Sequence, residues 1–189
     1  MENIEAYLEE LMGEYPICEY AFGTVDQIPF SDKVFMICET DCKRYGHCWA
    51  CPPNAGTIQD NIARIGGYSR FLVFSTVWEV SDAFNFDACL FVRKEHEALT
   101  REFREKLLAH YGLKKESLEE NAAPPIYCLS AGCSVCEECA CPEEPCRHPE
   151  DRLMSMESHG ILIMKLVEDL GLTYAYDGTT VVYFSAILF

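Results

Sequence analysis

Residues 70–80 read RFLVFSTVWEV, and this stretch gives the clearest signal for the fold. It is rich in Phe and Val and is bounded on both sides by turn-forming residues, a pattern typical of a β-strand. Residues 87–111 follow, and their apolar side chains recur at helical spacing until Gly112, a residue type that commonly ends helices. The centre of the sequence therefore predicts a strand followed by a long helix.

The segments before this pair predict shorter elements. Residues 2–12 form an amphipathic pattern that predicts a surface helix, and residues 33–38 (KVFMIC) predict a strand. Thr57 is a candidate N-cap with Asp60 three residues later, so residues 57–65 predict a second short helix. We expect the isoleucines of that helix to face the core: Ile58, Ile62 and Ile65.

The segments after the pair complete a mixed arrangement. Residues 125–130 (PIYCLS) predict a strand, residues 155–170 predict an apolar helix, and residues 172–189 predict a hairpin with its turn at Asp177-Gly178. Strands and helices interleave, and the chain ends in antiparallel strands. We therefore expect an α/β or α+β fold of two layers, with a mixed β-sheet, flanking helices and two cysteine-rich metal-binding loops.

The bulk composition narrows the class of protein. The 189 residues suit a single domain, residues 1–189, with a substantial core. The formal net charge is −16, which opposes binding to nucleic acid because that affinity rests on Lys and Arg. No apolar run approaches the roughly 20 residues that span a bilayer, and the acidic start MENIEAYLEELMGEY lacks the features of a signal peptide. We therefore expect a cytoplasmic protein that binds neither nucleic acid nor membrane.

Cysteine is the unusual component of the chain. There are 12 cysteines, and a reducing compartment disfavours disulfides, so metal ligation or thiol chemistry is the expected use. Most of them lie in two stretches, which we call the first cysteine segment (residues 38–56) and the second cysteine segment (residues 131–150). The other three lie among apolar residues and are expected to pack as small hydrophobes: Cys18, Cys89 and Cys128.

The second cysteine segment has the more specific spacing. Cys133, Cys136 and Cys139 follow one another at three-residue steps, as in the bacterial ferredoxin runs that bind iron–sulfur clusters. Zinc more often takes paired CxxC knuckles from two separated segments. The spacing therefore favours an iron–sulfur cluster, and zinc is the alternative.

The spacing does not decide which residue is the fourth ligand of this set. Cys141 follows Cys139 after a single residue, which makes both awkward as ligands of one cluster, whereas Cys146 has a more relaxed reach across PEEP. We expect Cys146 to be the ligand and Cys141 to be the spare thiol, with a residue of the first cysteine segment as the other candidate. Arg147 directly follows Cys146 and is a candidate donor to a cluster thiolate or to an external anion.

The first cysteine segment has enough thiols for a site of its own: Cys38, Cys42, Cys48 and Cys51. The two segments therefore hold either one metal centre or two. His47 and His148 lie inside the segments, and with so many thiols available we expect them beside the ligands or at the surface.

Two patterns in these segments resemble a known family. CKRYGHCWACPPNAGTI together with AGCSVCEECACPEEPCRHPEDRLMSMESHGI is similar to the uncharacterised "predicted metal-binding protein" family, domain of unknown function 2284. The resemblance runs from about Cys38 to the end of the sequence. It implies metal binding through cysteines, with an iron–sulfur cluster as the expected group and no established reaction. By position it implies eight ligands: Cys38, Cys42, Cys48, Cys51, Cys133, Cys136, Cys139 and Cys146.

Three functions follow from these residues. The leading one is a cytosolic protein that holds one or two [4Fe-4S]-type clusters and transfers single electrons, with a basic redox partner that suits its acidic surface. The second is a zinc-binding structural or interaction module. The third is a cluster-dependent enzyme, although no residue outside the thiols identifies a reaction. Four glutamates of the second cysteine segment predict a low reduction potential: Glu137, Glu138, Glu143 and Glu144.

Overall fold

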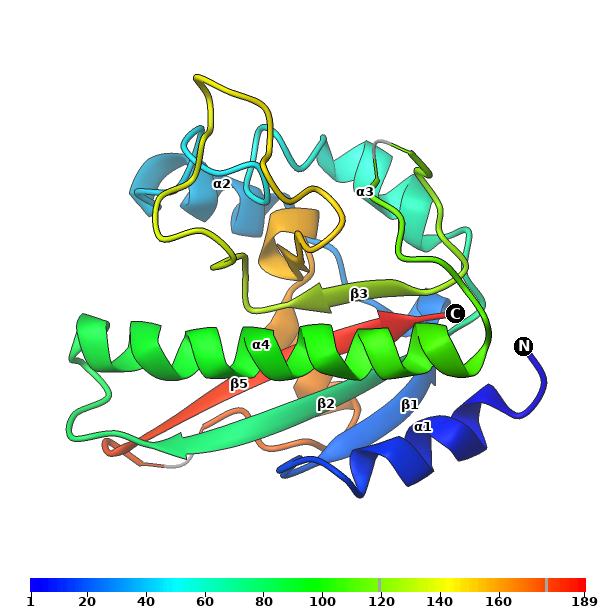
Figure 1. The fold of residues 1–189 in the computed structure, drawn as a ribbon. Helices are drawn as coiled ribbons and strands as arrows, with labels where there is room; N and C mark the ends of the chain where they lie inside the picture. Colours follow the sequence, from blue (N-terminus) through cyan, green and yellow to red (C-terminus); the bar gives the residue numbers. More distant parts are fainter. Residues whose placement is uncertain (119, 176) are drawn as a thin grey trace.

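The fold is built on one mixed sheet. A computed structural model of the chain describes residues 1–118, 120–175 and 177–189. The described strands form a five-stranded sheet in the order β1-β2-β5-β3-β4. Its pairs are antiparallel except for the parallel β3–β4 pair (Figure 1). The strands are β1 (Tyr20–Thr24), β2 (Arg70–Glu79), β3 (Tyr127–Ser130), β4 (Met154–Ser155) and β5 (Thr180–Leu188). The predicted α+β class with a mixed sheet is confirmed.

Helices cover the sheet on both faces. They are α1 (Ile4–Met12), α2 (Asp32–Asp41), α3 (Ile58–Ile65), α4 (Phe86–His110) and α5 (Ile163–Asp169), with short 3-10 helices η1 (Val25–Gln27) and η2 (Glu157–His159). Helices α1 and α4 lie on one face, and α3, α5 and the cysteine segments pack on the other (Figure 1). Of these described helices, none is both long and apolar enough to cross a membrane.

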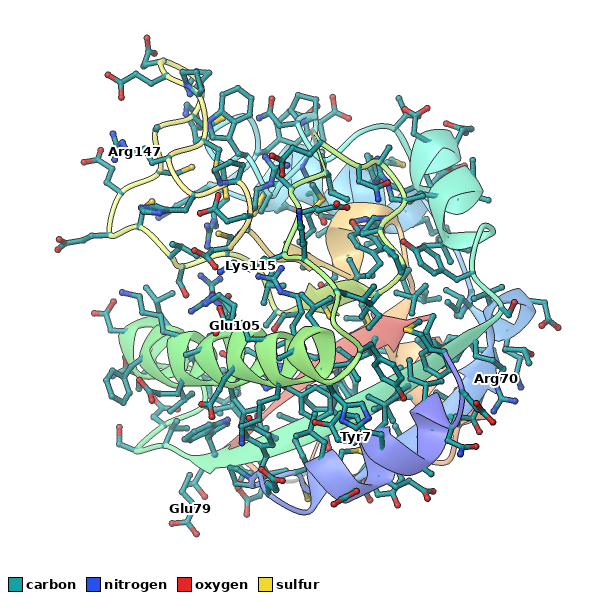
Figure 2. All side chains as sticks on the ribbon, turned by 45° about the vertical axis from the view of Figure 1, so that its right-hand side comes forward. Tyr7, Arg70, Glu79, Glu105, Lys115 and Arg147 are labelled. Carbon is teal, nitrogen blue, oxygen red and sulfur yellow. The ribbon has the colours of Figure 1, made fainter. Side chains whose placement is uncertain are left out.

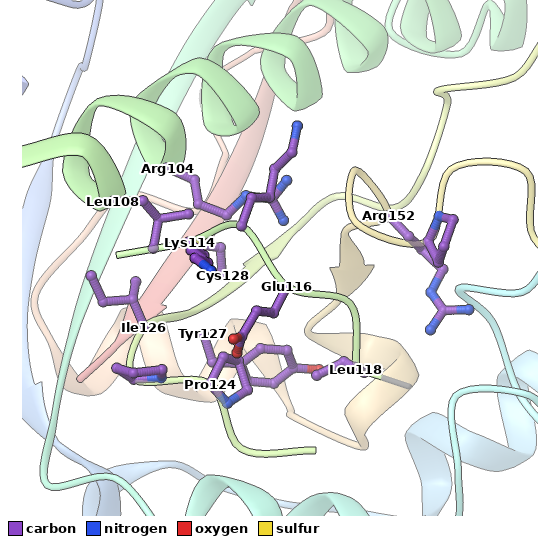
Figure 3. Close-up of a pocket in the computed structure, with 13 residues that line it drawn as sticks. Arg104, Leu108, Lys114, Glu116, Leu118, Pro124, Ile126, Tyr127, Cys128 and Arg152 are labelled. Carbon is purple, nitrogen blue, oxygen red and sulfur yellow. The ribbon is translucent and has the colours of Figure 1, made fainter. Parts of the chain in front are cut away.

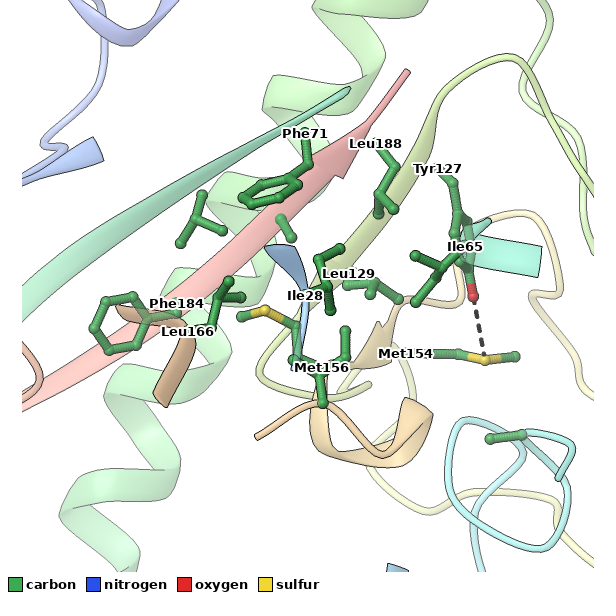
Figure 4. Close-up of a cluster of buried hydrophobic side chains, with 14 of the residues drawn as sticks. Ile28, Ile65, Phe71, Tyr127, Leu129, Met154, Met156, Leu166, Phe184 and Leu188 are labelled. Atoms are coloured by element: carbon green, nitrogen blue, oxygen red, sulfur yellow. Dashed lines mark hydrogen bonds between the residues drawn. The ribbon is translucent and has the colours of Figure 1, made fainter. Parts of the chain in front are cut away.

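Strand β2 joins the two halves of the core. Leu72 and Phe74 pack with α1 and α4, whereas Phe71 and Val73 pack on the opposite face, as the two-residue period of a strand requires. All four side chains are fully buried, and each such burial stabilises the fold by about 1.5–3 kcal/mol. Figure 4 shows the core cluster on the face of Phe71 and Val73, in which Phe71 lies among residues of β3, β5 and the segment after β4. The same figure shows the Tyr127 hydroxyl donating to Met154 Sδ at 3.7 Å.

Several predicted elements are confirmed. Helix α1 buries the four apolar residues of its stripe, and β2, α4 and β3 lie where the sequence places them. The predicted capping box of α3 is present, because Thr57 Oγ1 accepts from the Asp60 N–H and the Asp60 carboxylate accepts from the Thr57 N–H, both at 3.1 Å. Within α3, however, Ile62 is exposed and Asn61 is buried, so one of the three isoleucines was assigned to the wrong side.

The strand predicted for residues 33–38 is wrong. These residues lie in α2, which begins after Ser31, whose hydroxyl accepts from the Lys33 N–H at 3.3 Å. A short apolar run cannot be assigned to strand or helix by periodicity alone. The apolar residues of this run are also not all buried, since Met36 and Ile37 in α2 are both 60% exposed.

The C-terminal predictions need two corrections. The helix predicted for residues 155–170 is divided into β4, η2 and α5, because Gly160 adopts a left-handed φ of 77° between η2 and α5. The predicted hairpin is also wrong, since β5 pairs with β2 and β3 and not with the residues just before it. The turn at Asp177-Gly178 exists, with the Thr180 N–H donating to the Asp177 carbonyl at 3.3 Å. Tyr176 of the predicted hairpin lies outside the described residues.

Candidate metal centre

Helix α2 positions the first two thiols. Cys38 lies within the helix and Cys42 is its C-cap residue. Residues four apart lie on the same face of a helix, so these two cysteines are neighbours one turn apart. In an extended strand these two residues would lie about 13 Å apart, because each residue adds about 3.3 Å, and they would not form this pair.

A tight turn after α2 positions the next two. The Gly46 N–H donates to the Pro52 carbonyl at 2.9 Å, and the Cys51 N–H donates to the Cys48 carbonyl at 3.0 Å. Gly46 has a φ of 72°, a left-handed conformation that glycine adopts without steric cost. The turn brings the two thiols into hydrogen-bonding contact, with Cys51 donating to Cys48.

The second cysteine segment folds over this turn. Five thiols from both segments line one cavity, which we call the thiol cavity: Cys48, Cys133, Cys136, Cys139 and Cys146. Trp49 and His148 also line it. The Trp49 indole N–H donates to the Glu144 carbonyl at 2.9 Å, so this side chain ties the two segments together at the rim.

A second cavity, of about 180 Å³, lies on the α2 side, and we call it the helix cavity. Three thiols line it: Cys38, Cys42 and Cys51. Arg44 and Arg93, from the first cysteine segment and α4, lie in its wall. The eight predicted ligands are thus divided between two cavities, and the contact between Cys48 and Cys51 links them.

Arg44 holds the two segments together. Its Nη2 atom donates to Cys48 Sγ at 3.1 Å and to the Cys133 carbonyl at 2.5 Å. The sequence interpretation missed this residue, because its charge and position next to Lys43 are equally typical of a solvated surface. Its place two residues after Cys42 is the one signal that it belongs to the site.

The thiols differ in acidity. Burial raises the pKa of Cys38 to about 11, and the neighbouring Cys42 adds to this effect. The hydrogen bond from Cys51 lowers the pKa of Cys48, and the Arg44 guanidinium lowers it further. The same bond, together with burial, raises the pKa of Cys51. Metal binding at the helix cavity would therefore release protons from Cys38 and Cys51.

Arg147 does not have the contact suggested by its position. Its guanidinium donates to the Glu138 carbonyl and to the Glu144 carboxylate, both at 3.4 Å. Figure 2 shows Arg147 on the projecting part of the second cysteine segment. Arg44, by contrast, donates to a thiol of the cysteine segments, at Cys48.

Cys141 is engaged in other contacts. Its sulfur accepts from Asn54 Nδ2 at 3.1 Å and donates to the Gly46 carbonyl at 3.4 Å. Cys141 lines neither the thiol cavity nor the helix cavity.

The three cysteines outside the segments lie apart from both cavities. Cys128 is buried in β3 and lines a separate pocket with Arg104 and Lys114 (Figure 3). Cys89 is half-buried, and its thiol donates to the Ala83 carbonyl at 3.3 Å. Cys18 is exposed, so the prediction that it packs in the core is wrong.

The spacing of the sulfurs bears on the kind of metal group. Among the described cysteines, no three sulfur atoms lie within 4.8 Å of one another. Four thiolates around one zinc ion, at Zn–S bonds of about 2.3 Å, would place their sulfurs about 3.8 Å apart. The thiols are therefore spread more widely than a single tetrahedral ion requires, although they share two cavities.

One compact group of metal-binding side chains does exist at the edge of the second cysteine segment. His148, Glu150 and Asp151 place their ligand atoms within 4.8 Å of one another. Asp151, however, already pairs with Lys115 at 2.5 Å and with Arg104 at 3.8 Å. These two cations oppose a metal ion at this place, so we do not assign it as the site.

Comparison with known proteins identifies a family but no curated relative. A family model described as "Predicted metal-binding protein (DUF2284)" matches residues 24–189, which include both cysteine segments. No curated protein and no solved structure matches the chain.

Proposed function

The chain belongs to this family of predicted metal-binding proteins, and we propose that it binds iron–sulfur clusters of the [4Fe-4S] type through its cysteine thiolates. The observation that carries the proposal is the convergence of the two cysteine segments. Thiols that are about 90 residues apart in sequence line adjoining cavities and are linked by Arg44.

The donor set fits such a group. Soft thiolate ligands select iron–sulfur clusters, zinc and Cu(I) over harder cations. A cluster distributes its ligands over several irons, so the sulfurs stand farther apart than around one ion. The three-residue steps of Cys133, Cys136 and Cys139 support a cluster.

The ligands divide by cavity. In the thiol cavity, Cys133, Cys136, Cys139 and Cys146 form the proposed set, with Cys48 beside them. In the helix cavity, Cys38, Cys42 and Cys51 form a second set. Arg44 donates to Cys48 from between the two sets and offsets part of their negative charge.

A redox role follows from the same residues. A [4Fe-4S] cluster supplies one-electron chemistry, at a potential set by charge, hydrogen bonds and solvent exposure. The four glutamates of the second cysteine segment are exposed around the thiol cavity, and their charge disfavours adding an electron. The net charge of −16 would in addition favour docking to a basic electron partner, in a manner weakened by salt.

Anaerobic purification with metal analysis and EPR tests this function. We expect brown protein with a broad visible absorption, iron and acid-labile sulfide in similar amounts, and an EPR signal after reduction. A colourless protein with stoichiometric zinc would replace the redox role by a structural one. A protein without any metal, whose thiols all react with a labelling reagent, would overturn metal binding altogether.

A further inference from the structure

The helix cavity holds one carboxylate besides its thiols. Glu157, the first residue of η2, lines this cavity opposite α2. The residue keeps solvent-accessible surface, although protein surrounds its carboxylate and the residues on both sides of it are buried: Met156, Ser158 and His159. A carboxylate that points from a buried segment into a thiol-lined cavity is in the position of a ligand.

We propose that Glu157 is a metal ligand that completes a four-ligand centre in the helix cavity with Cys38, Cys42 and Cys51. This inference rests on the proposed function, because it names a further ligand for the same kind of group. Carboxylate oxygen is an established ligand of zinc, and of iron beside other donors.

Hydrogen bonds hold η2 in place on both sides of Glu157. Before it, Ser155 accepts from the Ser158 N–H at 3.0 Å through its hydroxyl. After it, His159 Nε2 lies 2.6 Å from the Tyr127 hydroxyl, deep in the core. A ligand on such a rigid support needs little reorganisation to bind, which favours affinity.

The same segment is fixed to α2, which carries two of the thiols. The Ser31 N–H, at the start of α2, donates to the Gly160 carbonyl at 2.8 Å. Gly160 has no side chain, and a Cβ there would lie 2.6 Å from Ile58 Cδ1 and 3.6 Å from Phe35 Cδ2. The close approach of η2 to Ile58 of α3 therefore depends on this glycine, whereas the distance to Phe35 of α2 is an ordinary contact.

Two cations lie in the wall of this cavity, Arg44 and Arg93. Arg93 is already paired with the buried Glu97 carboxylate, with Nε 3.1 Å from Oε1, so its charge is offset there. Arg44 is therefore the cation that offsets part of the negative charge of the three thiolates and the carboxylate.

Competing explanations fit the positions less well. Cys48 is the remaining thiol of the first cysteine segment, but it lines the thiol cavity and not the helix cavity. Glu157 also has contacts of its own, since its carboxylate is hydrogen-bonded with the Ser155 side chain and lies near the Arg93 guanidinium. Over the part of the chain that the structure describes, however, no ion pair within 4.0 Å reaches Glu157.

Metal analysis of matched variants tests the assignment. Glu157→Gln keeps the shape of the side chain but removes its charge, Glu157→Cys replaces oxygen by sulfur, and Cys38→Ser removes a thiol of the same centre. Glu168→Gln, at an exposed glutamate of α5, is the control. Iron, zinc and sulfide per chain are measured after anaerobic purification and brief exposure to a chelator, with EPR spectra and circular dichroism.

We expect Glu157→Gln to lose metal to the level of Cys38→Ser, while Glu168→Gln keeps the wild-type amount. Glu157→Cys should retain metal and show an altered EPR spectrum, because one ligand atom has changed; a purely structural role would not produce this. Wild-type metal content and spectrum in Glu157→Gln, beside a loss in Cys38→Ser, would overturn the role of Glu157 and leave the proposed function standing. Absence of metal from the wild type would overturn both.

Discussion

Arg44 Nη2 lies 3.1 Å from Cys48 Sγ, and the same nitrogen also donates to a carbonyl of the other cysteine segment, at Cys133. One half-buried side chain thus binds a thiol of one segment and the backbone of another that is 89 residues away in sequence. The arrangement of the candidate metal site therefore depends on a cation that is not itself one of the proposed ligands.

Replacing this cation should loosen the site. We expect Arg44→Gln to lower the free energy of unfolding by about 1–3 kcal/mol, since hydrogen bonds to charged groups contribute about that much. Chemical denaturation under anaerobic, reducing conditions measures the effect. Lys43→Gln, at the exposed neighbouring residue, is the control and should change stability by less than about 0.5 kcal/mol. Equal stability of both variants would contradict the bridging role of Arg44.

Cys146 and Cys141, the two candidates for the fourth ligand in the second cysteine segment, should respond differently to substitution by serine. Cys146→Ser is expected to lose iron from the thiol cavity, because Cys146 lines it. Cys141→Ser should keep most of its iron, because the Cys141 sulfur is hydrogen-bonded to Asn54 and to the Gly46 carbonyl and lines neither cavity. Iron content of the two purified variants measures the difference, and equal values would refute the assignment.

The reduction potential should be low and should respond to nearby charge. Iron–sulfur potentials span roughly −700 to +450 mV, and we expect a midpoint well below zero. The double variant Glu137→Gln and Glu138→Gln should shift the midpoint upward, because two negative charges near the thiol cavity are removed. A redox titration followed by EPR measures the shift. Glu9→Gln with Glu10→Gln, on the exposed side of α1, is the matched control. A wild-type midpoint near zero or positive would count against the prediction.

Acid should destabilise the fold through buried histidines. His96 is fully buried, with Nδ1 2.7 Å from Thr76 Oγ1 and Nε2 2.8 Å from Ser185 Oγ, and burial lowers its pKa to about 4. The unfolded chain takes up this proton near pH 6.5, whereas the folded chain does so only near pH 4. Stability from the neutral ring is therefore present above pH 6.5 and is lost as the pH falls towards 4.

The expected slope in that window is about 1.4 kcal/mol per pH unit for one such histidine. His159, whose pKa burial lowers to about 3, contributes in the same direction. Denaturation curves at several pH values measure the slope. His96→Gln should reduce it by about half, whatever its effect on stability at neutral pH. An unchanged slope in this variant would show that the proton uptake belongs to other groups.

Gly160 should tolerate no side chain. Its φ is 77°, and an added Cβ would lie 2.6 Å from Ile58 Cδ1. Gly160→Ala should therefore be destabilised by the cost of the left-handed conformation, about 1–2 kcal/mol, and by the clash in addition. Gly171→Ala is the control, because its φ is 72° and nothing lies within 4 Å of the added atom. Comparing the two unfolding free energies isolates the clash, and similar losses would mean that η2 moves aside.

Elements with a strong local signal were predictable. The alternation of β2 puts Phe71 and Leu72 on opposite faces, and the Thr57–Asp60 box begins α3, because both depend on neighbouring residues. The strand β5 was harder, since its partners come from far away in the sequence. Its apolar run indicated a strand but carried no information on which strands it would join.

The candidate site was predictable in its residue types and not in its arrangement. The three-residue steps from Cys133 to Cys139 indicate thiolate ligation from the sequence alone. The helical pairing of Cys38 with Cys42 was lost when KVFMIC was assigned to a strand, because the deciding cap at Ser31 lies outside that run. Arg44 and Glu157 could be recognised only in three dimensions, since each acts on a cysteine that is distant in the sequence.

The position of β5 has a consequence for biosynthesis. This strand lies between β2 and β3 in the sheet, yet it follows every cysteine of both segments in the sequence. While the ribosome is still making residues 180–188, the two halves of the sheet have nothing to join them. The cysteines are therefore synthesised before the complete sheet can bring the two cysteine segments together. During this stage, the thiols of the nascent chain are open to oxidation or to binding of the wrong metal.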